Sequence, residues 1–354
     1  MKLSGYLYIK NPTLMDYPYK ECIQSMLDCC DEVVVLDCSV VDGNNKEQHK
    51  DELSDLIKQN QQSLVVLDMT DQAKEIWNTP NSGIWDGKMK AIARGECTGE
   101  YLLQMDSDEI IEENARPKID NLIKQINGLN PPAPPIVACP VIEYWGSSGQ
   151  KVRIDVNPWK WRISKNDSRI THGIPVNLRK IDPKTNLLHA HHGTDGCDYI
   201  YADSGEVVPC ANFMNNDIET LRRAAVLDPA AAKTYEQWFN ILTNELPTIF
   251  HFSWWNIERK ISNYGHFWNK SWSSLYGEER PEGYNPFFPD QHFNEITEEE
   301  KRTLAMKLEQ ECGGHIFHTK WNGLKTNHVT ISKPIPAIVK TWCDKWKREN
   351  KATS

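Results

Sequence analysis

The sequence predicts an α/β protein with a mostly parallel sheet flanked by helices, followed by a mainly helical C-terminal region. In the first 110 residues, short apolar runs rich in β-branched residues alternate four times with segments of helical periodicity. Apolar residues at helical spacing also mark the ranges 257–268 and 297–312. The alternation indicates parallel strands joined by helical crossovers, and the later periodicity indicates helices.

The elements of the first part follow in chain order. Val33, Val34 and Val35 form a short β-branched run, which is typical of a strand buried on both faces. Pro18 suits the first turn of one helix, and Asn114 is the expected cap of another. The expected strands span residues 3–9, 32–36, 63–67 and 101–106, and the expected helices span 19–30, 47–59, 83–95 and 114–126.

A proline-rich segment interrupts this pattern at residues 127–135. Its four prolines exclude a helix or a central strand, so it marks the best boundary between subdomains. The range from about 145 to 210 is irregular and rich in Gly, Asp, His and Asn, which is typical of loops that face a substrate. Further strands are expected at 136–144 and 248–252, further helices at 218–225 and 230–242, and a loop at 276–290.

Composition excludes several classes of partner. The 354-residue chain has a net charge of −9 and a pI of about 5.7, which argues against nucleic acid. It holds no apolar run that could span a bilayer, and its first residues lack a signal-peptide pattern. Ten scattered cysteines favour reduced thiols and a cytoplasmic location. The basic tail 340–351 is compatible with peripheral membrane contact, although a surface helix explains it better.

Two aspartates at the end of the fourth strand form the strongest chemical motif. Asp106 and Asp108 directly follow an apolar run. Ligands of open α/β sheets bind beyond the carboxyl ends of the strands, and residues i and i+2 of an extended chain point the same way. The two carboxylates are therefore expected to converge on one Mn²⁺ or Mg²⁺ ion, which would hold a phosphate or diphosphate. The alternative is a solvated turn that binds no metal.

Several segments, taken in order, resemble the motifs of family 2 glycosyltransferases with the GT-A fold. Residues 33–43 (Val-Val-Val-Leu-Asp-Cys-Ser-Val-Val-Asp-Gly) resemble a strand ending in Asp and the Ser-x-Asp-Gly turn after it. Residues 90–101 resemble the segment ending in Gly-Glu-Tyr that leads into the metal strand, and residues 106–108 resemble the Asp-x-Asp motif. Residues 251–254 (His-Phe-Ser-Trp), with Lys260 behind them, resemble a later His-Tyr/Phe-Ser-Trp…Lys segment.

The resemblance, which is best over residues 1 to about 115, implies how the chain is divided. Residues 1–130 would form the α/β half that binds a nucleotide sugar. Residues 131–255 would form the acceptor-side half that completes the GT-A core. Residues 256–354 would form a mainly helical C-terminal region.

The resemblance also implies roles for the acidic motif. Asp108 would bind the metal directly, and Asp106 would bind it through water or orient the ribose. His251 would supply the third protein ligand, and an imidazole ligand suits Mn²⁺ better than Mg²⁺. The alternative for His251 is a core histidine in an aromatic cluster.

Other residues would bind the nucleotide-sugar donor. Asp37, at a strand end, would accept a hydrogen bond from the base or ribose, unless it is an ordinary strand-end aspartate. Ile9 or Lys10 would line the base pocket, and Lys260 would contact the diphosphate.

Lys90 stands where the family more often has arginine. It would still neutralise a phosphate, but it would not make the planar bidentate contact of a guanidinium. Lys88 and Arg94 lie on the same expected helix. The alternative is therefore a solvated basic face that binds nothing.

The catalytic base is the least constrained part of the prediction. An inverting enzyme needs a carboxylate or His to deprotonate the acceptor hydroxyl, whereas a retaining enzyme does not, and the sequence leaves the stereochemistry open. Related enzymes carry a His-Glu pair where His172 and Gly173 stand here, so the Glu is missing. The glycine-rich loop 191–198 suits an acceptor-side wall, which favours Asp195 and Asp198. The candidates considered are Glu143, Asp155, Asp195 and Asp198.

The sequence thus predicts a metal-dependent glycosyltransferase. It would move a hexose from a nucleoside diphosphate sugar to a hydroxyl of a glycan, lipid-linked sugar or small molecule, with Mn²⁺ or Mg²⁺ as cofactor. One alternative is a nucleotidyltransferase acting on sugar phosphates, which should carry a Gly-rich basic loop that this N-terminus lacks. The other is a carbohydrate-binding protein without catalysis.

Overall fold

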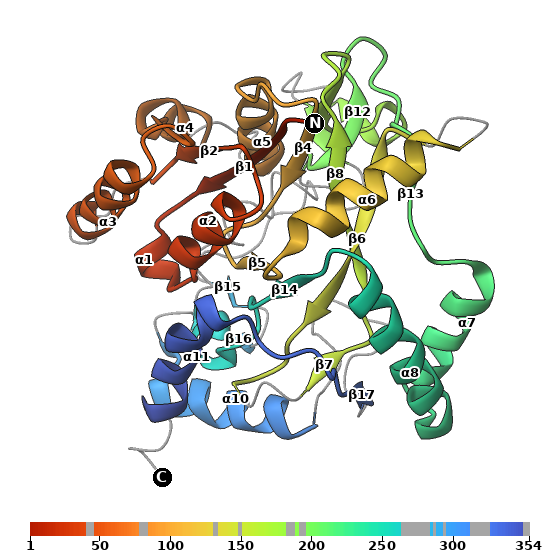
Figure 1. Cartoon of the computed structure of the whole chain (residues 1–354). Helices are drawn as coiled ribbons and strands as arrows, with labels where there is room; N and C mark the ends of the chain where they lie inside the picture. Colours follow the sequence, from red (N-terminus) through yellow and green to blue (C-terminus); the bar gives the residue numbers. More distant parts are fainter. Residues whose placement is uncertain are drawn as a thin grey trace.

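The computed structural model describes residues 1–39, 46–77, 84–129, 134–147, 151–181, 188–190, 196–262, 284–285, 288–292, 295–311 and 326–349. One large sheet crosses the molecule, and helices cover both faces of its first part (Figure 1). The strand–helix alternation predicted from the sequence is therefore confirmed as a mixed α/β architecture.

Four parallel strands form the first part of the sheet, in the order β3-β2-β1-β4. Alternate side chains of β2 enter two separate apolar cores, with Val33 and Val35 in one core and Val34 and Leu36 in the other. A strand buried on both faces needs helices on both faces, which explains its continuous β-branched run. The strands span β1 (Leu3–Ile9), β2 (Glu32–Asp37), β3 (Leu64–Asp68) and β4 (Tyr101–Gln104).

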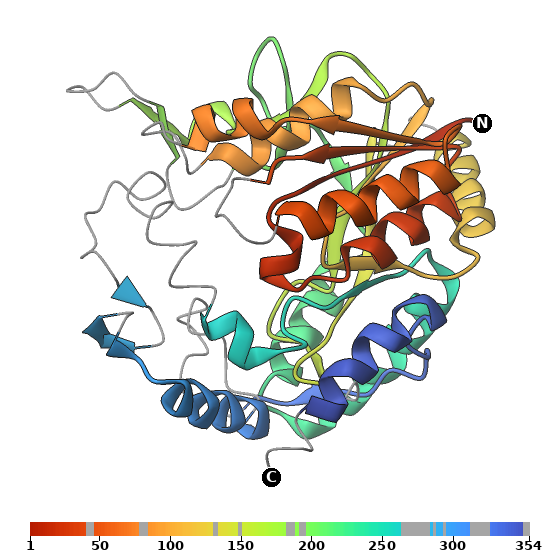
Figure 2. The ribbon, with the colours of Figure 1, turned by 90° about the vertical axis from the view of Figure 1, so that its left-hand side faces the viewer.

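The helices divide between these two faces, as the edge-on view in Figure 2 shows. On one face, α2 (Tyr19–Leu27), α3 (Lys46–Gln59) and α6 (Ala115–Asn127) contribute apolar residues to the larger core. On the other, α4 (Thr70–Trp77) and α5 (Trp85–Gly95) pack on β1 and β2. The short α1 (Pro12–Met15) follows β1. The sequence pattern missed α4, which is only eight residues long.

The second part of the sheet is mixed. β8 (Trp159–Lys165) runs antiparallel between β4 and β6 (Ile136–Glu143). β14 (Ile249–His251) is parallel to β6, and β5 (Glu109–Ile111) closes the row antiparallel to β14. β13 (Cys210–Ala211) adds a short parallel pairing to β6. Five of the eight pairings described in this sheet are parallel, so the prediction of a mostly parallel sheet is confirmed.

The expected irregular stretch before residue 210 contains several strands, and this part of the prediction was wrong. β8 mixes tryptophans with basic residues, so its pattern does not look like the apolar run of a buried strand. The paired strands are β7 (Val152–Arg153) with β17 (His328–Val329), β9 (Ile170–Gly173) with β12 (Asp198–Tyr201), and β10 (Arg179–Ile181) with β11 (Leu188–Ala190). The expected loop at 276–290 also contains most of a strand pair, β15 (Tyr284–Asn285) and β16 (Phe288–His292).

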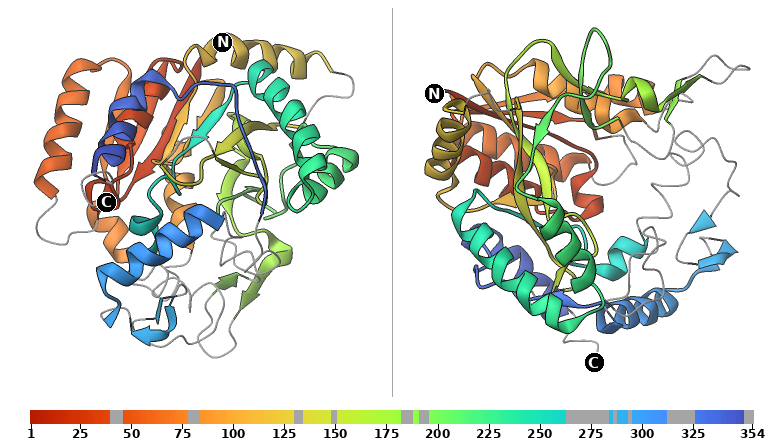
Figure 3. Two further views of the ribbon diagram at one scale, coloured as in Figure 1. Left: turned by 90° about the horizontal axis from the view of Figure 1, so that it is seen from below. Right: turned by 90° about the vertical axis from the view of Figure 1, so that its right-hand side faces the viewer.

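Helices surround this second part. The pair α7 (Asn216–Ala225) and α8 (Pro229–Glu245) lies at one flank, and α10 (Glu298–Glu311) and α11 (Ala337–Glu349) lie at the end that holds the C-terminus (Figure 3). A helical turn at residues 257–262 follows β14. No helix among the described residues has both the length and the apolar character needed to cross a bilayer. Strands from before and after residue 130 share one sheet; the proposed division at residues 130 and 255 stays a prediction.

Candidate active site

The acidic motif lies in a turn and not in an extended strand. β4 ends at Gln104, and β5 begins at Glu109. The Glu109 amide donates to the Asp106 carbonyl at 3.0 Å, and the Asp106 amide donates to the Glu109 carboxylate at 3.0 Å. Because of this turn, Asp106 and Asp108 face different partners, and the expected convergence of an extended chain was wrong.

Asp106 is held by two cations. Its carboxylate lies 2.8 Å from the Lys90 ammonium and 2.6 Å from the Arg162 guanidinium, and it accepts a hydrogen bond from Gln104 at 3.0 Å. Burial alone would raise the pKa of Asp106, but Arg162 and Lys90 outweigh burial and hold that pKa well below its ordinary value. Asp106 therefore stays ionised at neutral pH.

Asp108 faces His251 across the sheet. Its Oδ2 lies 3.3 Å from His251 Nε2, while His251 Nδ1 hydrogen-bonds to the Glu143 carboxylate. Burial alone would lower the pKa of His251, but Glu143 and Asp108 outweigh burial and raise that pKa to about 9. His251 therefore faces two carboxylates and does not sit simply among aromatic rings. Its role as a metal ligand stays a prediction.

Two cations from β8 complete this arrangement. Lys160 lies 2.8 Å from Glu109 and 3.4 Å from His251 Nδ1, and Arg162 lies 2.5 Å from Glu109. Glu109 is fully buried, so its charge depends on both contacts. No motif in the sequence predicted a role for Lys160, Arg162 or Glu109. Alternation in Trp159-Lys160-Trp161-Arg162 was the available signal, because it places both cations on one face of a strand.

Lys260 approaches from the segment after β14. Its ammonium hydrogen-bonds to Ser253 Oγ, lies over the Trp254 ring at 5.3 Å, and contributes to lowering the pKa of Asp108. We call the whole group the acidic-edge cluster; its members are Lys90, Asp106, Asp108, Glu109, Glu143, Lys160, Arg162, His251 and Lys260.

The expected basic face of α5 is only partly solvated. Lys88 is exposed, but Lys90 points to Asp106, and Arg94 is buried, donating to Ser164 and to the carbonyls of Ile170 and Lys165. A solvated face therefore accounts for Lys88 alone.

Residues predicted to bind the base lie at the same edge of the sheet but outside the cluster. Asp37 is paired with Ile9 in the strand register and is buried. Its carboxylate lies 3.1 Å from His49 and accepts a hydrogen bond from the Ser39 amide. Ile9 is fully buried, whereas the Lys10 ammonium lies 4.8 Å from the centre of the Trp85 ring. Their role in base binding stays a prediction.

Of the three candidate bases that the structure describes, only Glu143 belongs to the cluster. Asp195 lies outside the described residues. Asp198 begins β12 and lies near Cys210, since its charge contributes to raising the pKa of that thiol. Cys210 pairs with Ile136, which is at the opposite end of β6 from Glu143. With about 3.3 Å per residue, those two ends of β6 are about 23 Å apart. Asp155 is held by Arg153 in a two-pronged ion pair.

His172 belongs to the interior. Its Nε2 lies 2.7 Å from the Tyr6 hydroxyl, and its Nδ1 lies 2.9 Å from the Cys197 carbonyl oxygen. Burial lowers the pKa of His172 to about 3, so the ring is neutral at physiological pH. A Cβ at Gly173 would lie 2.4 Å from Ile200, so the missing family Glu could not fit here without displacing that side chain.

The donor set fits a divalent ion in part. Among the described residues, no group of three or more His, Cys, Asp or Glu side chains is arranged to hold a metal. Asp108 Oδ2 and His251 Nε2, however, lie 3.3 Å apart, and neighbouring donors in an octahedral shell with bonds of about 2.1 Å lie about 3 Å apart. Glu143 on the other ring nitrogen is the partner that a metal-binding histidine usually has. Asp106 is turned away toward Lys90 and Arg162.

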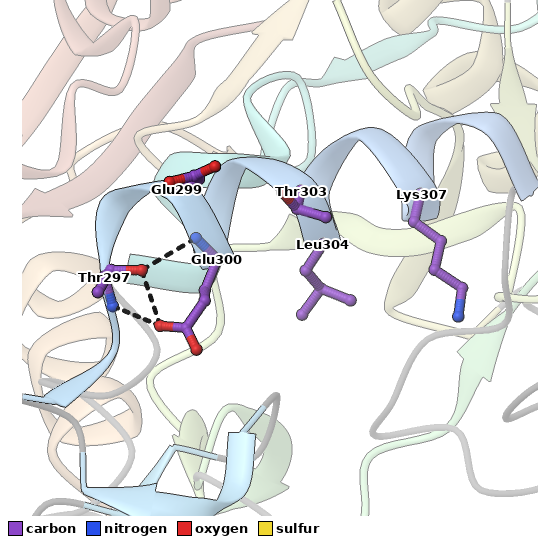
Figure 4. Close-up of a pocket in the computed structure, with 6 residues that line it drawn as sticks. All are labelled: Thr297, Glu299, Glu300, Thr303, Leu304 and Lys307. Carbon is purple, nitrogen blue, oxygen red and sulfur yellow. Dashed lines mark hydrogen bonds between the residues drawn. The ribbon is translucent and has the colours of Figure 1, made fainter.

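A hollow of about 420 Å³ lies elsewhere in the described part of the chain, and none of its lining residues belongs to this cluster. Figure 4 shows that its lining side chains follow α10. Thr297 and Glu300 form a capping box there, with the Thr297 amide donating to Glu300 at 2.8 Å. Their polar groups serve the helix start. A second, smaller hollow borders the cluster at Ser253 and Lys260.

Lys90→Gln should lower the free energy of unfolding by about 1–2 kcal/mol, because it removes one of two cations from Asp106. Urea unfolding would measure it. Lys88→Gln, on the same helix but exposed, is the control and should change stability by less than about 0.5 kcal/mol. Equal effects of the two variants would show that the Lys90–Asp106 pair contributes nothing.

No family model matches the chain, and no curated protein matches it. Among solved structures it is similar to crystal structures of S. aureus TarS. TarS 1–349 matches over 47% of each chain at 18% identity and TM-score 0.30. Its complex with UDP-GlcNAc matches over 78% of this chain and 74% of that chain at 16% identity and TM-score 0.32. A longer TarS structure matches over 89% of this chain but 56% of its own length, at 16% identity and TM-score 0.32.

Proposed function

We propose that this chain is a metal-dependent glycosyltransferase that moves a hexose from a nucleoside diphosphate sugar to a hydroxyl acceptor. The acceptor class is a glycan, a lipid-linked sugar or a small molecule. The observation that supports this most is the acidic-edge cluster, which gathers carboxylates, cations and a histidine at the carboxyl ends of β4, β6 and β14. Ligands of α/β sheets bind at that edge.

The charges of the cluster suit a diphosphate bound together with a divalent cation. Its four carboxylates are balanced by its four Lys and Arg side chains when His251 is neutral. A divalent ion would leave about two positive charges uncompensated, and a nucleoside diphosphate sugar carries about two negative ones. Glycosyl transfer then adds negative charge to the leaving diphosphate, which nearby cations stabilise.

Within this proposal, Asp108 and His251 would hold the metal, which when bound would neutralise the diphosphate as a Lewis acid. Glu143 keeps His251 Nδ1 engaged, so that Nε2 faces Asp108. Lys160 is better placed for a phosphate than Lys90 or Arg162, because about 30% of its side chain is exposed while those two are buried. Ile9 on β1 and Asp37 on the neighbouring strand β2 would contact the nucleoside.

A thermal-shift screen of UDP- and GDP-sugars with Mn²⁺ tests the proposal. One nucleoside diphosphate sugar should raise the melting temperature by several degrees, and EDTA should abolish the shift. Release of the nucleoside diphosphate with an acceptor present should follow. A shift with a nucleoside triphosphate alone would support a nucleotidyltransferase instead. A shift with glycans and no nucleotide would support a binding protein.

A further inference from the structure

The contacts of Arg162 single it out within the acidic-edge cluster. It is 5% exposed and lies on β8. The last residue pair between β8 and β4 is Ile163 with Leu103, and Arg162 is the next residue of β8 beyond that pair. Its guanidinium donates to the Gln104 side-chain oxygen, to Asp106 at 2.6 Å and to Glu109 at 2.5 Å. One side chain thus contacts the last residue of β4, the first residue of β5 and the acid in the turn between them.

The turn itself gives these contacts their effect. Glu109 accepts from the Asp106 amide and donates its own amide to the Asp106 carbonyl, so the two residues move together. Their carboxylates lie close together, because both accept a hydrogen bond from the same guanidinium nitrogen of Arg162. Without a cation between them, two negative charges in a buried site would repel and open the turn.

We propose that Arg162 is a positioning residue that fixes the turn from Asp106 to Glu109, and thereby directs Asp106 to Lys90 and Asp108 to His251. Its importance for catalysis rests on the proposed function, whereas its effect on the turn does not. The guanidinium Nη2 donates to both Asp106 and Glu109 while Nη1 donates to Gln104, so the planar fork ties the two acids to the end of β4. A lysine would supply the charge on one nitrogen, without the second arm of the fork.

Hydrogen exchange on the ligand-free protein tests the proposal in Arg162→Lys. Amides of residues 105–110 should exchange at least about tenfold faster than in the unchanged protein, while those of residues 33–37 in β2 should not change. Arg222→Lys is the matched control, because Arg222 is also buried and also pairs with a carboxylate, but it lies on α7. It should leave residues 105–110 unchanged.

Unchanged exchange at 105–110 in Arg162→Lys, or an equal increase in Arg222→Lys, would overturn the proposal. If Arg162→Lys does not fold, Glu109→Gln decides, since it weakens the same contact and must also speed exchange at 105–110. In the folded Arg162→Lys variant, the Mn²⁺ concentration giving half of the nucleotide-dependent thermal shift should rise about tenfold. Absence of any nucleotide shift in the unchanged protein would refute the proposed function and leave the exchange result standing.

Discussion

Replacing Asp108 with Asn is expected to abolish the metal dependence of nucleotide binding and to lower turnover by about 10³-fold. Asn keeps the shape of the side chain but removes the charge that faces His251 at 3.3 Å. Asp108 has a pKa below its ordinary value, because His251 and Lys260 outweigh the effect of burial, so it is ionised at neutral pH. A neutral amide would leave His251 as the remaining donor of the pair, which is too weak to hold a divalent ion alone.

Release of nucleoside diphosphate and a Mn²⁺ titration followed by thermal shift would measure both effects. Asp68→Asn is the matched control. Asp68 also ends a strand at this edge of the sheet, but its ion pair among the described residues is with the exposed Lys50. It should leave turnover within about twofold. Asp108→Asn with unchanged turnover and unchanged metal dependence would contradict the proposed function.

Local patterns predicted the parallel half of the sheet, because each of its strands is an apolar run between polar turns. Val33 to Leu36 is buried on both faces, so its sequence alone indicates its environment. β8 gave no such signal, since Arg162 is buried and Lys160 is half-buried only because Asp106 and Glu109 lie opposite them. A buried cation is predictable only once its partner is known to be near, and that partner is more than 50 residues away in the chain.

The candidate site shows the same limit. The resemblance implied that Asp108 and His251 would bind one metal ion; the two side chains lie 3.3 Å apart, and their role as ligands stays a prediction. The direction of Asp106 was not predictable from the motif, because the turn that reverses it depends on Glu109 and Arg162. Glu143 was one of four candidate bases, and its contact with His251 follows from the pairing of β6 with β14.

Raising the pH should destabilise the metal-free protein through His251. The pKa of His251 is about 9 in the folded state and about 6.5 in an unfolded chain. Protonated His251 therefore contributes stability that is fully present below pH 6.5 and is lost as the pH rises through 9. The contribution is on the order of 3 kcal/mol. His172, whose folded pKa is about 3, is neutral in the folded state throughout this window and loses its proton in the unfolded chain near pH 6.5, so its contribution no longer changes as the pH rises toward 9.

Urea unfolding in EDTA between pH 7 and 9.5 would measure this loss, with Glu143→Gln as the comparison. Glu143 is the largest of the charges that raise the His251 pKa, so the variant should lose much less stability over the same range. Buried thiols such as Cys22, whose pKa is raised by burial, destabilise both proteins alike at high pH, so the difference between the two curves isolates His251. Curves that fall in parallel would refute the assignment. A metal ion needs the neutral ring, so Mn²⁺ affinity should rise over this same window while metal-free stability falls.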